Sequence, residues 1–162
     1  MFTKGITGGF MALGVTVCSA KIFDAFYADE KEKTLYHGHS YTANPLACTA
    51  ANASLQILKS DECQKNIQRI VQQHQSFATT IANHPLIKET RQRGTILAIE
   101  FNTKEGTSYF NSIRDKLYNF YLDNGVLLRP LGNIIYIMPP YCITNDELHK
   151  VYDVIIKSFD LL

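Results

Sequence analysis

The chain has 162 residues, of which 46% are hydrophobic and 19% charged, and its formal net charge at pH 7 is +1. Because no basic run is present, neither nucleic acid nor a membrane surface is expected as a partner, and no apolar stretch reaches the roughly 18 residues that a membrane-spanning helix needs. The 4 cysteines are far apart and form no CxxC pair, which favours free thiols in a reducing cytoplasm over a disulfide framework or a zinc site.

The first group of predicted elements ends at a boundary near residue 60. An apolar run over residues 10–19 predicts a buried strand of an α/β sheet, and apolar residues at helical spacing over 21–28 predict a short helix. A further helix is predicted over 45–58, because Asn44 suits the N-cap position and the proline that follows it suits the first helical turn.

The second group has the pattern of an α+β domain in which helices cover a small sheet. An amphipathic helix over 62–82 carries His74 on its apolar face, where a packing role is favoured over a ligand role. The other elements predicted here are a strand at 94–101, a helix ending at Asn124 and Gly125, a hairpin of strands at 126–129 and 134–138, and a last helix that opens with a capping box at Thr144–Glu147.

Three features could carry chemistry. Lys4 stands among glycines, so a bulky group could approach its amine, which would be a nucleophile if desolvated; an exposed lysine in a glycine-rich turn is the alternative that spacing alone favours. The polar loop at 37–45 leads into a helix start, which favours an anion but is also common in surface turns. Arg129 at a strand end suits a carboxylate. Together these three groups fit a pyridoxal phosphate (PLP) enzyme.

Other chemistries fit less well. His37 and His39 are alternate residues of an extended loop, so their imidazoles point apart, and no third metal ligand is evident. No GxSxG elbow surrounds Ser40, and the glycines after Lys4 form neither a Walker loop nor a GxGxxG motif.

The segments KGITGGFMALGV at 4–15 and HGHSYTANPLAC at 37–48 resemble the class III family of PLP-dependent aminotransferases. The segment RPLGNIIYIMPPY at 129–141 narrows the resemblance to those members of the family that act in biotin synthesis. These members transfer the amino group of S-adenosylmethionine to 8-amino-7-oxononanoate, giving 7,8-diaminononanoate. The resemblance covers essentially the whole chain. It implies an α/β protein of fold type I, PLP as cofactor, and a cytoplasmic homodimer with shared active sites.

The resemblance also implies roles for single residues. Lys4 matches the lysine that holds the cofactor as a Schiff base and later moves a proton. His39 and Ser40 match positions that reach the cofactor phosphate of the partner subunit, although proline and threonine are common there; the hydroxyl of Ser40 is kept.

Three further positions match substrate contacts. Gly38 matches a substrate-contacting position, Arg129 matches the arginine that binds the carboxylate of 8-amino-7-oxononanoate, and Tyr136 matches a tyrosine near the same substrate. No residue is expected to bind a metal.

Family members have a long part before the lysine, with a Gly-Ser phosphate turn, a stacking aromatic ring and an aspartate that pairs with the pyridine nitrogen. Residues 1–60 are therefore expected to be the C-terminal end of the large PLP-binding domain, and 61–162 the C-terminal small domain, with Met1 an internal start or a truncation point. By itself such a chain is expected to be inactive. The alternatives are another class III aminotransferase, including a lysine-donor version of the same step, and a non-catalytic fragment that binds no cofactor.

Overall fold

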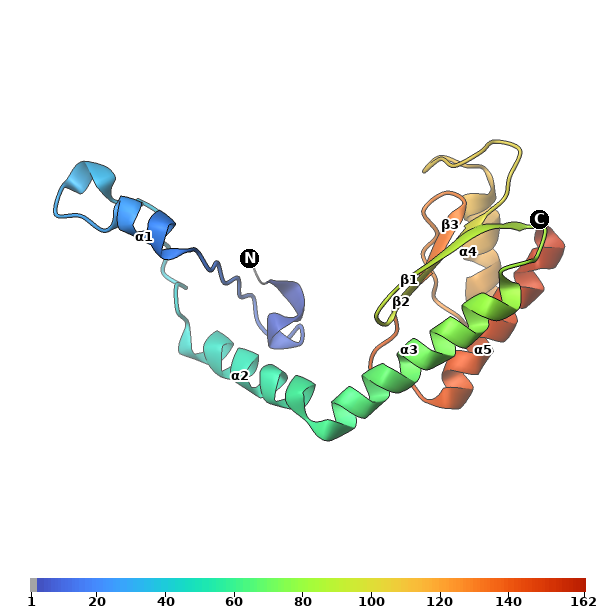
Figure 1. Ribbon diagram of the computed structural model, residues 1–162, viewed down its shortest axis with the longest axis horizontal. Coiled ribbons are helices and arrows are strands. Elements are labelled where there is room, and N and C mark those ends of the chain that lie inside the picture. The colour runs from blue at the N-terminus through green and yellow to red at the C-terminus, as the bar shows by residue number, and fades with distance from the viewer. Residues whose placement is uncertain (1–2) are drawn as a thin grey trace. The chain divides into compact units, whose positions relative to one another are not determined.

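The computed structural model describes residues 3–162. The chain divides into two compact units, Met1–Ser60 and Asp61–Leu162. The described part of the first unit contains a 3-10 turn at Lys4–Thr7, helix α1 (Ala20–Phe26), a second 3-10 turn at Lys31–Lys33 and helix α2 (Pro45–Lys59) (Figure 1). Across residues 3–162 no helix is both long enough and apolar enough to cross a bilayer.

Helix α2 begins where the sequence predicts. The side-chain Oδ1 of Asn44 accepts hydrogen bonds from the backbone N–H groups of Leu46 at 2.9 Å and Ala47 at 3.4 Å, and Pro45 occupies the first turn. The helix packs against the Lys4–Thr7 turn, where Thr7 and Ala47 are the buried side chains of residues 3–60. These contacts place the N-terminal turn beside α2.

The strand predicted over residues 10–19 is wrong. No strand runs through these residues, and Phe10 and Val17 are 87% and 70% exposed. A strand is held by backbone hydrogen bonds to a neighbouring strand, and the described residues of this unit form no other strand. The apolar run therefore stays extended and largely exposed, whereas α1, whose hydrogen bonds are local, forms close to its predicted position.

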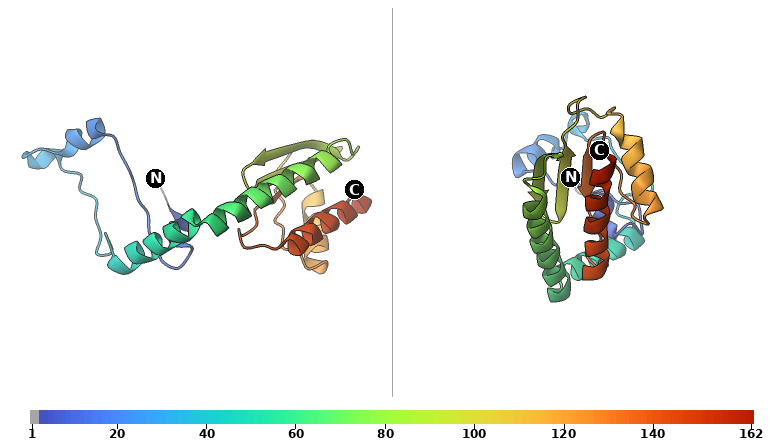
Figure 2. Two further views of the ribbon diagram at one scale, coloured as in Figure 1. Left: turned by 60° about the horizontal axis from the view of Figure 1, so that its bottom comes forward. Right: turned by 90° about the vertical axis from the view of Figure 1, so that its right-hand side faces the viewer.

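The second unit is a small antiparallel sheet with helices packed against it. Its elements are α3 (Asp61–Ile81), β1 (Ile87–Arg93), β2 (Ile96–Phe101), α4 (Ile113–Asp123), β3 (Ile134–Ile137) and α5 (Asn145–Lys157). Strand order is β1-β2-β3, and both pairs of neighbours are antiparallel. Figure 2 shows the strands running alongside α3 from two directions.

Two strand predictions in this unit need correction. Strand β1 was not expected, because its sequence IKETRQR is polar and only its first residue, Ile87, is buried. Residues 126–129 form no strand, so the expected hairpin between them and 134–138 is wrong; β3 pairs with β2 instead. The helix over 62–82 and the strand over 94–101 are confirmed as α3 and β2.

The core lies in this unit. Side chains from all three strands and from α3, α4 and α5 meet in one cluster. Its members that are fully shielded from solvent are Ile70, Leu97, Ile99, Phe101, Leu117, Tyr121, Ile135, Leu148 and Ile155. The predicted capping box is also present, since Thr144 and Glu147 exchange hydrogen bonds at the start of α5.

His74 is a packing residue, as predicted. It is fully buried on α3 and touches Tyr152 of α5, which runs beside α3 (Figure 1). Its Nε2 lies 3.1 Å from the carbonyl oxygen of Thr95, and its Nδ1 lies 2.6 Å from the Tyr152 hydroxyl. A carbonyl only accepts, so Nε2 carries the proton and Nδ1 accepts from Tyr152. Burial lowers the pKa of His74.

The stability of the chain is expected to fall as the pH drops below 6.5, the ordinary pKa of a histidine. The folded state holds His74 neutral, so the unfolded state binds more protons in this range and gains stability relative to it. Urea unfolding midpoints measured between pH 5 and pH 8 test this. Substitution His74→Gln should flatten the profile, whereas His149→Gln, at an exposed position of α5, should leave it unchanged. An unaltered slope in His74→Gln would contradict the assignment.

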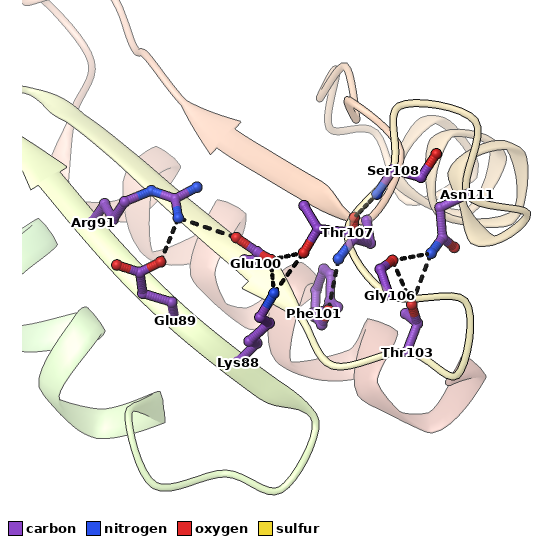
Figure 3. A network of polar contacts seen from close by, with 11 residues as sticks. Lys88, Glu89, Arg91, Glu100, Phe101, Thr103, Gly106, Thr107, Ser108 and Asn111 are labelled. Carbon is purple, nitrogen blue, oxygen red and sulfur yellow. Dashed lines mark hydrogen bonds and ion pairs between the residues drawn. The ribbon is translucent and has the colours of Figure 1, made fainter.

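Strand β1 is tied to β2 by a buried carboxylate. Glu100 is 3% exposed, and its oxygens accept from Lys88 Nζ at 2.8 Å, from Arg91 Nη1 at 3.0 Å and from the Thr107 hydroxyl (Figure 3). These hydrogen bonds, that of Lys88 foremost, lower the pKa of Glu100 to about 2. The charge is therefore kept and compensated inside the unit.

Candidate functional site

Lys4 lies at the start of the N-terminal 3-10 turn with an exposed side chain. Its φ of 57° is in the left-handed region, which costs a non-glycine residue about 1–2 kcal/mol. Within residues 3–162 its amine makes no hydrogen bond or ion pair, and a Cβ added at Gly5 would meet nothing within 4 Å. The amine is therefore accessible and not engaged by another group.

His39 and Ser40 form the turn before α2. The backbone N–H of Tyr41 donates to His39 Nδ1 at 3.2 Å, and that of Thr42 donates to the His39 carbonyl at 3.0 Å. Because Nδ1 accepts, the neutral ring carries its proton on Nε2. The Ser40 hydroxyl has no partner among the described residues. Both side chains are exposed, so each offers a donor to an anion, and the neighbouring Gly38 adds no bulk.

The first turn of α2 does not supply the anion site that the sequence suggested. Pro45 has no N–H, and the N–H groups of Leu46 and Ala47 already donate to Asn44. The side chains of His39 and Ser40 are thus the candidate donors to an anion here, and the helix dipole favours negative charge at the same end of α2.

In the second unit, Arg129 and Tyr136 line one open groove of about 1360 Å³. Leu127, Met138 and Pro139 give it apolar walls. Mostly apolar walls with a few polar groups are typical of small-molecule sites. The guanidinium of Arg129 is exposed and makes no ion pair within residues 3–162, so it is available to a carboxylate.

Burial alternates along the two segments that carry Arg129 and Tyr136, and both of these side chains line the groove. Leu128 and Pro130 point into the unit and are buried, so Arg129 between them points outward. In β3 the same alternation buries Ile135 and Ile137 and leaves Tyr136 half-buried opposite Ala98 of β2.

Two further cations line the groove and were missed by sequence reasoning. They are Arg114 of α4, which pairs with Asp115 at 2.7 Å, and Lys150 of α5. A charged residue on an amphipathic helix is usually solvated, so the sequence held no signal beyond their position off the buried face.

The donor set of the first unit fits PLP. Lys4 offers an amine for the aldehyde, and His39 Nε2 and Ser40 Oγ offer donors for the phosphate. No cluster of His, Cys, Asp or Glu side chains able to hold a metal ion is found from residue 3 to residue 162.

Two proteins with similar sequences carry the same name. The sequence pattern of the family described as aminotransferase class-III matches residues 1–159. The adenosylmethionine-8-amino-7-oxononanoate aminotransferase of Synechococcus elongatus is 40% identical over 98% of this chain and 37% of its own length. That of Helicobacter pylori is 35% identical over 99% of this chain and 37% of its own.

Two solved aminotransferase structures are similar in fold to this chain. The adenosylmethionine-8-amino-7-oxononanoate aminotransferase of Methanocaldococcus jannaschii superposes with a TM-score of 0.84 at 31% identity, covering 98% of this chain and 37% of that one. An amine transaminase from an uncultivated Pseudomonas species, in a PLP-bound form, gives 0.83 at 26% identity, over 98% and 37% of the two chains. The chain thus spans about 37% of the length of the relatives it matches.

These likenesses confirm the predicted fold class, that of the fold type I PLP-dependent transferases. They also confirm PLP as the cofactor of the family to which the sequence pointed. With its match running over residues 1–159, the chain belongs to the class III aminotransferase family.

Proposed function

We propose that the chain is the C-terminal portion of an aminotransferase that moves the amino group of S-adenosylmethionine to 8-amino-7-oxononanoate, giving 7,8-diaminononanoate. The observation that carries the proposal is an unpaired Arg129 beside Tyr136 in a largely apolar groove. A carboxylate at the end of an alkyl chain matches that chemistry. The names of the relatives at 35–40% identity support the same substrate.

The cofactor-facing roles belong to the first unit. PLP, when bound, supplies an electron sink at the carbon that loses or gains the amino group. Lys4 would hold the cofactor covalently through Nζ, and the free amine would carry a proton to and from the substrate carbon. His39 Nε2 and Ser40 Oγ donate to the phosphate of a cofactor bound mainly by the partner subunit.

Three residues have proposed substrate-facing roles. The fork of Arg129 binds the carboxylate of 8-amino-7-oxononanoate through two parallel hydrogen bonds. Tyr136 packs beside the alkyl chain, and Gly38 permits close approach of the backbone. The first unit is the end of a large cofactor-binding domain and the second is a small domain, within a cytoplasmic homodimer whose active sites are shared.

The substitution Arg129→Lys in the full-length enzyme tests the substrate. It is expected to raise the KM for 8-amino-7-oxononanoate about tenfold or more, because lysine keeps the charge but loses the bidentate geometry. The KM for S-adenosylmethionine should not change. Arg93→Lys, at an exposed position of β1 outside the groove, is the control. An unchanged KM for the keto acid would remove Arg129 from the carboxylate site.

Two assays distinguish the proposed function from its alternatives: turnover with a panel of amino donors, and uptake of PLP. Turnover with lysine but not with S-adenosylmethionine would identify the lysine-donor version of the step. Failure of the full-length protein to take up PLP in an absorbance titration would identify a non-catalytic protein.

A further inference from the structure

The turn between Arg129 and Tyr136 is closed by two backbone hydrogen bonds. The N–H of Leu131 donates to the carbonyl of Ile134 at 2.7 Å, and the N–H of Ile134 donates back to Leu131 at 3.2 Å. Both groove residues therefore extend from the two ends of one tight turn, and whatever fixes this turn fixes their separation.

Asn133, within that turn, is a buried polar residue with only 1% of its surface exposed. Its Nδ2 donates to the carbonyl of Phe101 at 2.9 Å, and its Oδ1 accepts from the backbone N–H of Ser108 at 3.3 Å. Its own carbonyl accepts from the N–H of Phe101 at 2.9 Å. Figure 3 shows Phe101 and Ser108 within the same polar network.

These bonds anchor the register of β3 on β2. With Asn133 bonded to Phe101, the next pairs along the ladder are Ile134 with Glu100 and Tyr136 with Ala98. A slip by one residue would turn Tyr136 into the core and bring Ile135 out of it, since side chains alternate between faces. Asn133 touches neither groove wall, so its influence on the groove passes through the backbone.

The 102–112 loop also contacts the turn that contains Asn133. The backbone at Ser108 lies against Gly132, the residue before Asn133, so closely that a Cβ there would meet the Ser108 oxygen at 1.7 Å. Asn111 belongs to the same loop, but its side chain bonds only to residues outside the 129–136 turn: its Nδ2 donates to Thr103 Oγ1 at 2.7 Å and to the Gly106 carbonyl at 2.9 Å (Figure 3), and its Oδ1 accepts from the N–H of Ile113.

We propose that Asn133 is a positioning residue of the substrate groove, which holds Arg129 and Tyr136 at the separation that the keto-acid substrate needs. This inference rests on the proposed function for its kinetic consequence. Its structural part, that Asn133 sets the geometry of residues 129–136, stands by itself.

The test compares Asn133→Ala with Asn111→Ala in the full-length enzyme. Asn111 is a matched control, because it is 2% exposed and its side chain makes three hydrogen bonds, to Thr103, Gly106 and Ile113, where that of Asn133 makes two. Both variants are expected to lose stability. Only Asn133→Ala is expected to raise the KM for 8-amino-7-oxononanoate, by on the order of five- to tenfold, the size of one or two lost hydrogen bonds. Its kcat and its KM for S-adenosylmethionine should stay within about twofold of the parent.

A second measurement keeps the inference testable if the substrate assignment fails. Hydrogen exchange of the peptide spanning 129–136 should accelerate in Asn133→Ala and not in Asn111→Ala. If Asn133→Ala does not accumulate as folded protein, Asn133→Asp, which keeps the acceptor for Ser108 and loses the donor to Phe101, is used in its place.

The possible outcomes distinguish failure of the positioning role from failure of the proposed function. Equal exchange and equal KM shifts in the two variants would overturn the positioning role. Faster exchange only in the Asn133 variant, in an enzyme that turns over a different keto substrate, would overturn the proposed function and keep the role. No turnover of any keto substrate by the parent, with equal exchange in both variants, would overturn both.

Discussion

The substitution Gly132→Ala is expected to destabilise the second unit by about 4 kcal/mol or more, or to prevent its folding. The new Cβ would lie 1.7 Å from the carbonyl oxygen of Ser108, 2.7 Å from its carbonyl carbon and 3.0 Å from the Cα of Tyr109. All three atoms are backbone, so no side-chain rotation relieves the clash. The φ of 64° adds strain for any residue with a Cβ. Urea unfolding of the chain, followed by far-UV circular dichroism, measures the loss.

Gly94→Ala separates the clash from the backbone strain. Gly94 has a φ of 56°, but a Cβ there would meet nothing within 4 Å. It should therefore lose only the conformational part, about 1–2 kcal/mol. If the two variants lost the same free energy, the contact between Gly132 and the Ser108 backbone would not be the reason that glycine is required.

The substitution Lys4→Ala in the full-length enzyme is expected to abolish covalent attachment of PLP and to lower kcat by a factor on the order of a thousand or more. Lys4 is exposed and unpaired within residues 3–162, so its removal disturbs no contact of the fold. Incubation with PLP, borohydride reduction, digestion and mass spectrometry give a readout that does not depend on activity. In the unsubstituted enzyme, the peptide that contains Lys4 should gain the mass of the reduced cofactor, and in Lys4→Ala the corresponding peptide should not.

Lys21→Ala is the matched control, because Lys21 is an exposed lysine of the same unit, on α1. It should keep both the modified Lys4 peptide and the activity. A reduced cofactor found on another lysine, or retained by Lys4→Ala at full stoichiometry, would contradict the role of Lys4.

The helices could be predicted because what starts and holds them is local. Asn44 caps α2, and Thr144 and Glu147 form the box that starts α5, as their positions in the sequence indicate. The apolar stripe of α3 likewise places His74 in the core. Each of these features depends on residues within about two turns of one another.

The strands were predicted less well, because a strand exists only beside a partner. The apolar run 10–19 has the composition of a strand and forms none, whereas the polar segment Ile87–Arg93 forms β1 because β2 lies next to it. The composition of residues 126–129 likewise predicts a strand, yet these residues form none and β3 takes β2 as its neighbour.

Residue types in a fixed order along the chain were enough to predict the family and to select Lys4 and Arg129 for testing. The packing of the chain was needed to show that Arg129 and Tyr136 line one groove and that Asn133 holds the turn between them. It was also needed to show that Gly132 leaves no room for a side chain. These contacts could not be predicted, because Asn133 is 32 residues from Phe101 and 25 residues from Ser108 in the sequence, and the three residues meet only when separate segments pack together.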